Sequence, residues 1–201
     1  MMFSFSQACK KIAELKLVQA SSGNLSERCH LYQDRFFITP TGVWLSDMDY
    51  RQQVACSLST GEKIKLDPPM TCSEPSSEKE LHRKIYNDNK HIFVVLHCQP
   101  VYSTIIACCS SKIESFNVIP EIPYYIPHIS YIDYYSPGSV GLTLAASEAV
   151  NLGNELVIMR NHGLLVVGSS LENVITKAVF FELACEILVK SPCQGNIIPS
   201  E

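Results

Sequence analysis

Four side chains along the sequence are of types that could bind a metal ion and move a proton. His97 and Gln99 close an apolar, strand-like run, so their side chains project to one face while Cys98 projects to the other. His162 follows a second apolar run, and Glu78 lies at the start of a helical segment. Open α/β sheets place their sites at strand ends. Histidines with a carboxylate match a catalytic zinc that keeps one position open for substrate.

Each of these residues also has an ordinary structural interpretation. A histidine at a strand end is commonly a hydrogen-bonded structural residue. Glu78 has an alternative partner in His82, four residues on and on the same helix face, where the pair could form only a surface contact. The remaining histidines lie in polar or irregular context and are assigned no role: His30, His91 and His128.

Three turns rich in small residues could hold an anion. They are Ser21-Ser22-Gly23-Asn24, Thr39-Pro40-Thr41-Gly42 and Pro75-Ser76-Ser77, the last leading directly into a helix. Each turn is expected to offer free backbone N–H groups, and the serine and threonine side chains add hydroxyls. Amides that converge at a helix start, with the positive end of its dipole behind them, form a phosphate site. Taken singly, each turn is equally well an ordinary chain reversal or helix cap.

Alternating helices and strands must position these residues. Apolar residues at three- and four-residue steps, with capping residues and prolines, predict helices over residues 5–19, 77–87, 100–109, 137–152 and 171–190. Apolar runs predict strands over residues 25–32, 35–38, 54–58, 92–96, 156–159 and 164–167, the first two joined as a hairpin. Ser4 is a predicted cap of the first helix, and Ser77 with Glu80 forms a capping-box pattern for the second.

The interleaved elements predict one α/β domain over residues 1–201, built on a central sheet. No internal repeat or low-complexity linker interrupts the sequence. Residues 119–137 contain four prolines and five tyrosines and are predicted to be irregular and to carry function.

The composition excludes several classes of protein. Of 201 residues, 46% are hydrophobic and 18% charged, which argues against disorder. The net charge of −4, without a basic run, argues against binding to nucleic acid or an anionic membrane. No stretch approaches the roughly 18 apolar residues of a membrane span, and the amphipathic start is unlike a signal peptide, so we expect a cytoplasmic protein. Nine cysteines without a C-x-x-C pair predict reduced, mostly buried thiols.

Five motifs in sequence order make the chain similar to the class II aldolase/adducin head family. They are Ser22-Gly23-Asn24-Leu25-Ser26, Ile38-Thr39-Pro40-Thr41-Gly42, Pro75-Ser76-Ser77-Glu78, Leu96-His97-Cys98-Gln99-Pro100 and Arg160-Asn161-His162-Gly163. The resemblance covers nearly the whole chain. It implies a three-layer α/β/α fold with a mostly antiparallel central sheet, assembled as a homotetramer with sites between neighbouring subunits.

The resemblance also implies a role for each matched residue. The substrate phosphate is expected to bind at the three turns, through Gly23, Asn24, Thr41, Gly42, Ser76 and Ser77. Glu78 is the implied general acid/base. His97 and His162 are implied zinc ligands, and Glu78 joins them when no substrate is bound. Tyr124 of an adjacent subunit is implied to protonate or position the carbonyl end of the aldehyde.

The chain departs from the family at Gln99, where the second histidine of an H-x-H strand is usual. A glutamine carbonyl oxygen can ligate a metal, but this neutral, harder donor suits zinc less well than imidazole does. The expected cofactor is a divalent ion, zinc first, with Gln99 as a fourth ligand beside Glu78, His97 and His162.

The function implied by the resemblance is metal-dependent, retro-aldol cleavage of a short phosphorylated ketose, with a carboxylate of raised pKa moving the proton. Related epimerases carry aspartate at the position of Glu78, so the glutamate favours a lyase. A related sugar-phosphate dehydratase stays open as an alternative. Gln99 favours another alternative, a noncatalytic adducin-head-like oligomerisation or binding domain with a degenerate metal site. The expected partners are a small phosphorylated sugar and further copies of the chain.

Overall fold

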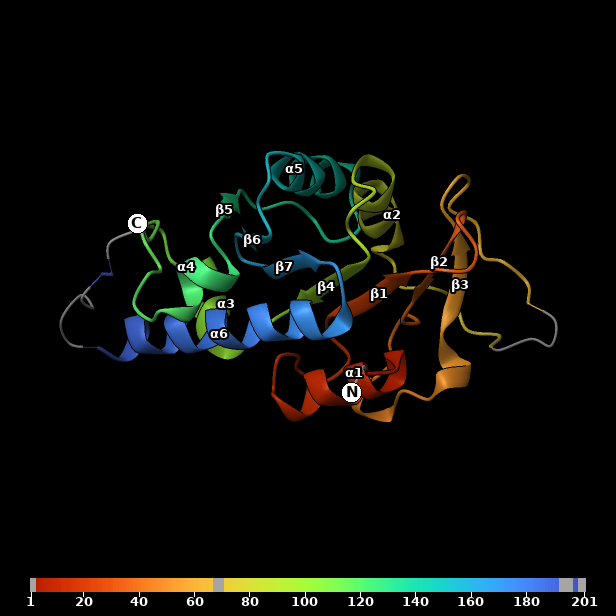
Figure 1. Cartoon of the computed structure of the whole chain (residues 1–201), viewed down its shortest axis with the longest axis horizontal. Helices are drawn as coiled ribbons and strands as arrows, with labels where there is room; N and C mark the ends of the chain where they lie inside the picture. Colours follow the sequence, from red (N-terminus) through yellow and green to blue (C-terminus); the bar gives the residue numbers. More distant parts are fainter. Residues whose placement is uncertain (1–2, 67–70, 192–196, 199–201) are drawn as a thin grey trace.

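The computed structural model describes residues 3–66, 71–191 and 197–198. Within these residues a sheet lies between two layers of helices (Figure 1). Its strands are β1 (Asn24–Arg28), β2 (Arg35–Ile38), β3 (Val54–Ser57), β4 (Val94–Cys98), β5 (Ile129–Ile132), β6 (Leu156–Met159) and β7 (Gly163–Gly168). The α-helices are α1 (Phe5–Glu14), α2 (Lys79–Asp88), α3 (Val101–Cys108), α4 (Glu121–Tyr125), α5 (Val140–Asn151) and α6 (Leu171–Lys190). Two 3-10 helices, η1 (Leu45–Asp47) and η2 (Tyr50–Gln52), precede β3.

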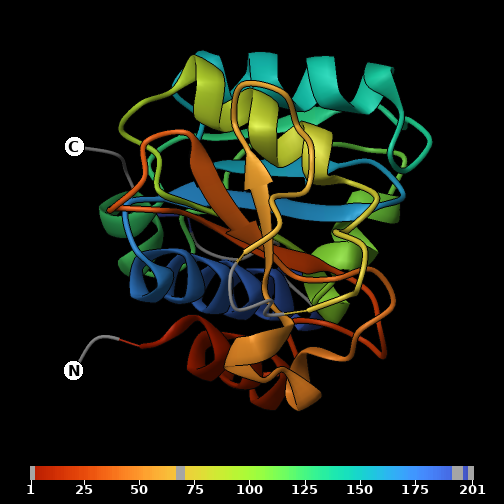
Figure 2. The same cartoon turned by 90° about the vertical axis from the view of Figure 1, so that its right-hand side faces the viewer.

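The strands lie side by side in the order β3-β2-β1-β4-β7-β6-β5. All neighbouring pairs are antiparallel except β5 and β6, which are parallel. Helices α2 and α5 cover one face, and α6 lies along the other face with α1, α3 and α4 beside it (Figure 2). The predicted α/β class, with three α/β/α layers and a mostly antiparallel central sheet, is confirmed.

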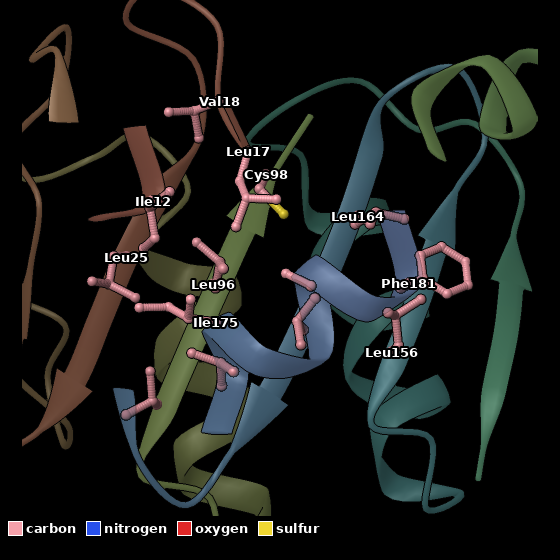
Figure 3. Packing of buried hydrophobic residues seen from close by; sticks show 14 of the residues in the cluster. Ile12, Leu17, Val18, Leu25, Leu96, Cys98, Leu156, Leu164, Ile175 and Phe181 are labelled. Atoms are coloured by element: carbon pink, nitrogen blue, oxygen red, sulfur yellow. The ribbon is translucent and has the colours of Figure 1, made fainter. Parts of the chain in front are cut away.

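Each face of the sheet has its own apolar core because strand side chains alternate. Leu25 and Leu96 point toward the layer of α1 and α6, where Ile175 packs close to them (Figure 3). On the other face, Val95 and Leu165 pack beneath α2 and α5. All residues of β4 and β7 are buried. Covering on both faces explains why these strands are continuous apolar runs in the sequence.

The first helix is capped as predicted but is shorter. The Ser4 side chain accepts a hydrogen bond from the Gln7 backbone amide, and the Gln7 side-chain oxygen accepts one from the Ser4 backbone amide. The helix ends at Glu14 rather than near Gln19, because Lys16 adopts a left-handed φ of 57°. Residues 17–23 therefore lead into β1 as a separate connection.

The other predicted boundaries are confirmed or moved by a few residues. β2, β6 and α6 have the predicted bounds. α5 begins three residues after Pro137, because the Ser139 side chain caps it by accepting a hydrogen bond from the Leu142 amide. β1 ends at Arg28 rather than Tyr32, although the predicted hairpin with β2 is confirmed.

The prediction that residues 119–137 are irregular is wrong. They contain α4 and β5, and β5 extends the sheet by pairing with β6. Pro123 is tolerated because it lies in the first turn of α4, where its missing N–H removes no intrahelical hydrogen bond. β5 pairs with a strand that is distant in the sequence, so a local sequence pattern does not predict it.

The predicted capping box at the start of α2 is also wrong. Glu78 is the N-cap residue, with φ −95° and ψ 11°, and no side chain caps the helix. Ser76 Oγ instead accepts a hydrogen bond from the Glu78 amide at 3.3 Å. Glu80 pairs with Arg83 across 2.7 Å. The Glu78 side chain is consequently available for contacts outside its own helix.

The described cysteines are all free thiols, as predicted. Only Cys9, Cys56, Cys98 and Cys185 of them are fully buried, fewer than the sequence suggested. Among the described helices, none combines the length and apolar character needed to cross a membrane.

Candidate active site

A polar pocket of about 180 Å³ opens where β1, β4 and the start of α2 meet. The predicted residues that line it are Gly23, Asn24, Thr41, Gly42, Ser76, Ser77, Glu78, His97, Gln99 and His162. Pro40, from the predicted turn Thr39-Pro40-Thr41-Gly42, and Pro137, from the segment 119–137 that was predicted to carry function, line it as well. A larger hollow of about 560 Å³ beside β3 shares no lining residue with it.

Two strands and a helix position the side chains at the base of the pocket. Asn24 of β1 and His97 of β4 are partners in the antiparallel register, so their side chains share one face of the sheet. Asn24 contacts Glu78, and two residues along the strand Ser26 contacts His82. These two contacts have matching spacings along the strand and the helix, because two strand residues advance about 6.6 Å and four helical residues rise about 6 Å.

Glu78, His97 and His162 form a compact cluster of possible ligands. Glu78 Oε2 lies 3.6 Å from His97 Nε2, and Glu78 Oε1 lies 3.5 Å from His162 Nε2. The two imidazole rings meet nearly edge to face, with their centroids 4.8 Å apart. One donor atom from each of the three residues lies within 4.8 Å of the other two. Glu78 and His97 are 5% and 2% exposed, so the cluster is shielded from solvent.

The backbone fixes the tautomer of His97. Its Nδ1 lies 2.8 Å from the carbonyl oxygen of Leu164 in the neighbouring strand. Because a carbonyl only accepts, Nδ1 carries the hydrogen and Nε2 presents its lone pair to the cluster. This arrangement is common for metal-binding histidines, whose second ring nitrogen donates to a backbone carbonyl or carboxylate.

Gln99 lies beside this lone pair. Its amide nitrogen Nε2 is 2.8 Å from His97 Nε2, so the amide donates a hydrogen bond to the imidazole. The predicted common face of the two side chains is confirmed. In this orientation it is the nitrogen of Gln99, rather than the predicted ligand oxygen, that contacts His97.

The unsatisfied groups at the site suit a cation. Three buried oxygens at the site have no hydrogen-bond partner among the described residues, and these are Asn24 Oδ1, Glu78 Oε1 and Gln99 Oε1. Buried polar atoms without partners are uncommon in folded proteins. Acceptor oxygens beside two imidazole nitrogens match the donor types that divalent metals use, so these residues fit an ion of that kind.

His162 depends on a close approach between two chain segments. Gly163 has a left-handed φ of 140°, and a Cβ there would lie 2.6 Å from the Cys98 carbonyl oxygen and 2.8 Å from Gln99 Cγ. Only glycine allows β7 to begin this close to the end of β4. The motif His162-Gly163 therefore places the imidazole against the residues of β4.

Charge and burial set the protonation states at the site. Burial raises the pKa of Glu78, but the interaction with His97 and the hydrogen bond from Asn24 outweigh it, and the pKa lies below its ordinary value. The expected raised pKa is therefore wrong for the protein without bound ligands. Burial also lowers the pKa of His162. A carboxylate and a neutral imidazole are the forms that ligate metals.

The turns around the pocket offer fewer free amides than predicted. The Thr41 amide donates to the Glu74 carbonyl, and the Ser76 amide donates to the Thr39 carbonyl, each over 3.0 Å. The amides of Gly23, Gly42 and Ser77 have no partner within the described part of the chain. Available anion donors are therefore these three amides together with nearby hydroxyls.

His82 belongs to a buried network that the sequence analysis missed. Ser26 Oγ lies 2.6 Å from His82 Nδ1 and 2.7 Å from the Tyr86 hydroxyl. The suggested surface contact between Glu78 and His82 is wrong, because both are buried. The four-residue spacing of Glu78, His82 and Tyr86 was the available signal, since it places all three on one helix face.

Tyr124 does not lie at this pocket. It is on α4, is 78% exposed, and packs edge to face against Tyr125 with ring centroids 4.7 Å apart. Tyr124 is therefore not among the residues that line the pocket within one copy of the chain.

Comparison with known proteins agrees with the fold. Residues 4–189 match the family described as Class II Aldolase and Adducin N-terminal domain, and the chain belongs to this family. It is 29% identical over 178 residues to an L-fuculose phosphate aldolase of Methanocaldococcus jannaschii, covering 89% of this chain and 90% of the relative. It is 30% identical over 156 residues to a 3-oxo-tetronate 4-phosphate decarboxylase of Escherichia coli, covering 76% of this chain and 68% of the relative.

Among solved structures, a sugar-phosphate aldolase from Thermotoga maritima superimposes with a TM-score of 0.83 at 21% identity, covering 98% of this chain and 96% of that one. At this identity the match supports the fold. The sequence relatives are aldolases and decarboxylases, which supports an enzyme of this family.

Proposed function

We propose that the protein is a metal-dependent lyase that cleaves a short phosphorylated ketose by retro-aldol chemistry. The observation that carries this proposal is the buried cluster of Glu78, His97 and His162, with donor atoms within 4.8 Å of one another beside a pocket lined by small-residue turns. A phosphate site next to a metal site suits a substrate with a carbonyl group near a phosphate ester.

The phosphate would bind at the outer part of the pocket. The amides of Gly42 and Ser77 and the hydroxyls of Thr41 and Ser77 are donors that an anion can use. The full proposed set is Gly23, Asn24, Thr41, Gly42, Ser76 and Ser77. No lysine or arginine is among the described lining residues, so the affinity would come from neutral donors.

The divalent ion would be held by His97, His162, Glu78 and Gln99. When bound, it supplies a positive charge that orients the carbonyl and hydroxyl oxygens of the substrate and stabilises the negative charge left as the carbon–carbon bond breaks. His97 Nδ1, donating to Leu164, keeps the ring oriented throughout.

Glu78 would move the proton. Its lowered pKa means that it is ionised at neutral pH, so it starts as a base. In the direction of bond formation it removes a proton from the carbon beside the carbonyl of a three-carbon ketone phosphate. In the direction of cleavage the carboxyl group would first take up a proton from solvent when the substrate binds, and would then give that proton to the same carbon. Asn24 holds the carboxylate through Oε2 and orients it for this transfer.

Tyr124 would act in the pocket of a neighbouring copy of the chain, in a homotetramer. Its phenol would donate a proton to the aldehyde oxygen during bond formation, and its phenolate form would take that proton from the substrate hydroxyl during cleavage. Its exposure on α4 is consistent with a role across an interface.

The test is to incubate the purified protein with pentulose and hexulose phosphates and zinc, manganese or cobalt, and to measure release of aldehyde and three-carbon ketone phosphate. Glu78→Gln should lower the rate by about 10²- to 10⁴-fold, the usual contribution of a positioned acid/base. Glu148→Gln, an exposed glutamate on α5, is the matched control and should retain the rate. An unchanged rate in Glu78→Gln, or no turnover with any sugar and metal, contradicts the proposal.

A second candidate is decarboxylation of a phosphorylated 3-oxo acid, favoured by the relative that is 30% identical and named for that reaction. Loss of carbon dioxide leaves a negative charge beside a ketone, as aldol cleavage does, so the same cluster would serve. Release of carbon dioxide without an aldehyde product distinguishes it from the aldolase.

A further inference from the structure

We propose that Gln99 weakens the preference of this site for Zn²⁺ over harder ions such as Mn²⁺, and that its amide must turn over before it can ligate. The inference deepens the proposed function, since it rests on the divalent-ion site proposed there. It concerns which ions the site accepts, and not the reaction that follows.

The first step of the argument is the contact between Gln99 and His97. The Gln99 amide nitrogen donates a 2.8 Å hydrogen bond to His97 Nε2, whose lone pair is the one that would bind an ion. Leu164 fixes the other ring nitrogen as a donor, so in the neutral ring, the form that binds a metal, Nε2 can only accept. In the ion-free protein the Gln99 amide therefore forms a hydrogen bond with the nitrogen of His97 that would otherwise bind the ion.

The second step concerns the other end of the same amide. Gln99 Oε1 is buried and has no hydrogen-bond partner among the described residues. A half-turn about the last side-chain bond exchanges Oε1 and Nε2, and that torsion is broad and roughly two-fold. After the turn an oxygen lone pair would face the lone pair of His97 Nε2. The two repel each other unless a cation binds both, so the turned form is favoured only with an ion present.

The third step is that the backbone keeps Gln99 at the site. Its own amide donates to the Leu17 carbonyl over 3.1 Å, and its Cγ packs against Gly163. The chain that follows Gln99 is also held in place, because the Tyr102 and Ser103 amides at the start of α3 donate hydrogen bonds to the Glu182 carboxylate. The side chain can turn its amide but cannot easily leave the pocket.

Selectivity follows from the donor types. The proposed ligands give two imidazole nitrogens and two oxygens, whereas a histidine at position 99 would give three nitrogens and one oxygen. Imidazole favours Zn²⁺, and carbonyl or carboxylate oxygen favours Mn²⁺ and Mg²⁺. Breaking the amide–imidazole hydrogen bond weakens the binding of every ion to a similar extent, but the exchange of nitrogen for oxygen weakens Zn²⁺ more than Mn²⁺.

The experiment measures ion binding without substrate. Protein stripped with EDTA is titrated with Zn²⁺ in competition with a chromophoric chelator, and with Mn²⁺ by the electron paramagnetic resonance signal of the free ion. Gln99→His should raise the ratio of Zn²⁺ to Mn²⁺ affinity by about tenfold or more, the scale on which changes around a metal site act. Gln99→Leu removes both the covering amide and the oxygen ligand, so Mn²⁺ binding should fall while Zn²⁺ binding is kept or strengthened.

Gln33→His is the matched control, because Gln33 is exposed between β1 and β2 and away from the pocket lining. It should leave both affinities unchanged. An equal affinity ratio in the wild type and Gln99→His overturns the inference alone, even if the protein is an active lyase. Loss of lyase activity in every assay does not alter the binding result. Absence of ion binding in wild type, Gln99→His and Gln99→Leu overturns both proposals.

Discussion

The side-chain amide of Asn24 donates a 2.9 Å hydrogen bond to Oε2 of Glu78, which joins the first strand of the sheet to the N-cap of α2. The register partner of Asn24 is His97, so one rung of the sheet positions both neighbours of the carboxylate. Glu78 Oε1 is left directed at His162. Side chains that orient ligands in this way commonly contribute to the affinity of a site for its metal.

Replacing Asn24 should therefore weaken the proposed metal site. In Asn24→Ala the Glu78 carboxylate loses its oriented donor, and we expect divalent-ion affinity to fall by about 10- to 100-fold. Calorimetric titration of EDTA-treated protein with Zn²⁺ or Mn²⁺ measures the change. Asn154→Ala is a suitable control, since Asn154 also donates from Nδ2, to the Ala149 carbonyl at 2.8 Å, but lies outside the pocket. Equal affinities for Asn24→Ala and the wild type would show that the hydrogen bond does not support ligation.

The close packing at Gly163 gives a prediction about stability. In Gly163→Ala the new Cβ meets the Cys98 carbonyl oxygen, a backbone atom that cannot move aside easily. Gly153→Ala is the matched control, because Gly153 also has a left-handed φ, 92°, but a Cβ there meets nothing within 4 Å. Both variants bear the strain of the left-handed backbone, and Gly163→Ala should lose about 1–3 kcal/mol more for overpacking. Urea denaturation measures the difference, and equal losses would exclude close packing as the reason for glycine.

Helices and strands with a clear local sequence pattern could be predicted from the sequence. The bounds of α6 and β6 follow from an apolar period and a short apolar run, and Ser4 caps α1 as its position suggests. Residues 119–137 could not be predicted in the same way. There β5 is stabilised by pairing with β6, a contact between distant segments that overrides the local signal of prolines and tyrosines.

At the site, too, local features could be predicted from the sequence and features that depend on distant segments could not. The spacing of His97 and Gln99 correctly placed both side chains together, because strand alternation is a local property. Which atom of Gln99 contacts His97 depends on the neighbouring strand, through Leu164. The lowered pKa of Glu78 likewise depends on partners brought in by the fold. Sequence patterns thus indicated which residues meet, while their tautomers and protonation states required the structure.

A site shared between copies of the chain can be tested by mixing two inactive variants. Glu78→Gln lacks the proposed acid/base, and Tyr124→Phe lacks the proposed phenol. If each pocket combines Glu78 of one copy with Tyr124 of the next, random reassembly of equal amounts in a closed ring restores about a quarter of the pockets. Lyase activity should therefore recover to about a quarter of the wild-type value after subunit exchange. Recovery would not occur if both residues served the same copy, so a mixture that stays inactive contradicts the shared pocket.

The buried network around His82 predicts a specific dependence of stability on pH. Burial lowers the pKa of His82 from 6.5 to about 3, with the charge of Glu78 raising it and that of His97 lowering it further to a smaller extent. Between these values the unfolded chain binds a proton that the folded protein does not, so stability rises with pH in this window. The contribution of neutral His82 to the free energy of unfolding is complete above about pH 6.5 and is lost as the pH falls toward 3.

His82→Asn removes this titration while keeping a polar group near Ser26 Oγ. The wild type should therefore lose more stability than the variant on acidification, and their difference in unfolding free energy should narrow by about 3 kcal/mol between pH 7 and pH 4. Urea denaturation at four pH values, with EDTA present, measures that difference. The carboxylates are the same in both proteins, so their effects on stability largely cancel in the comparison. A difference that stays constant with pH would mean that the pKa of His82 is the same in the folded and unfolded states, contrary to the effect expected from its burial.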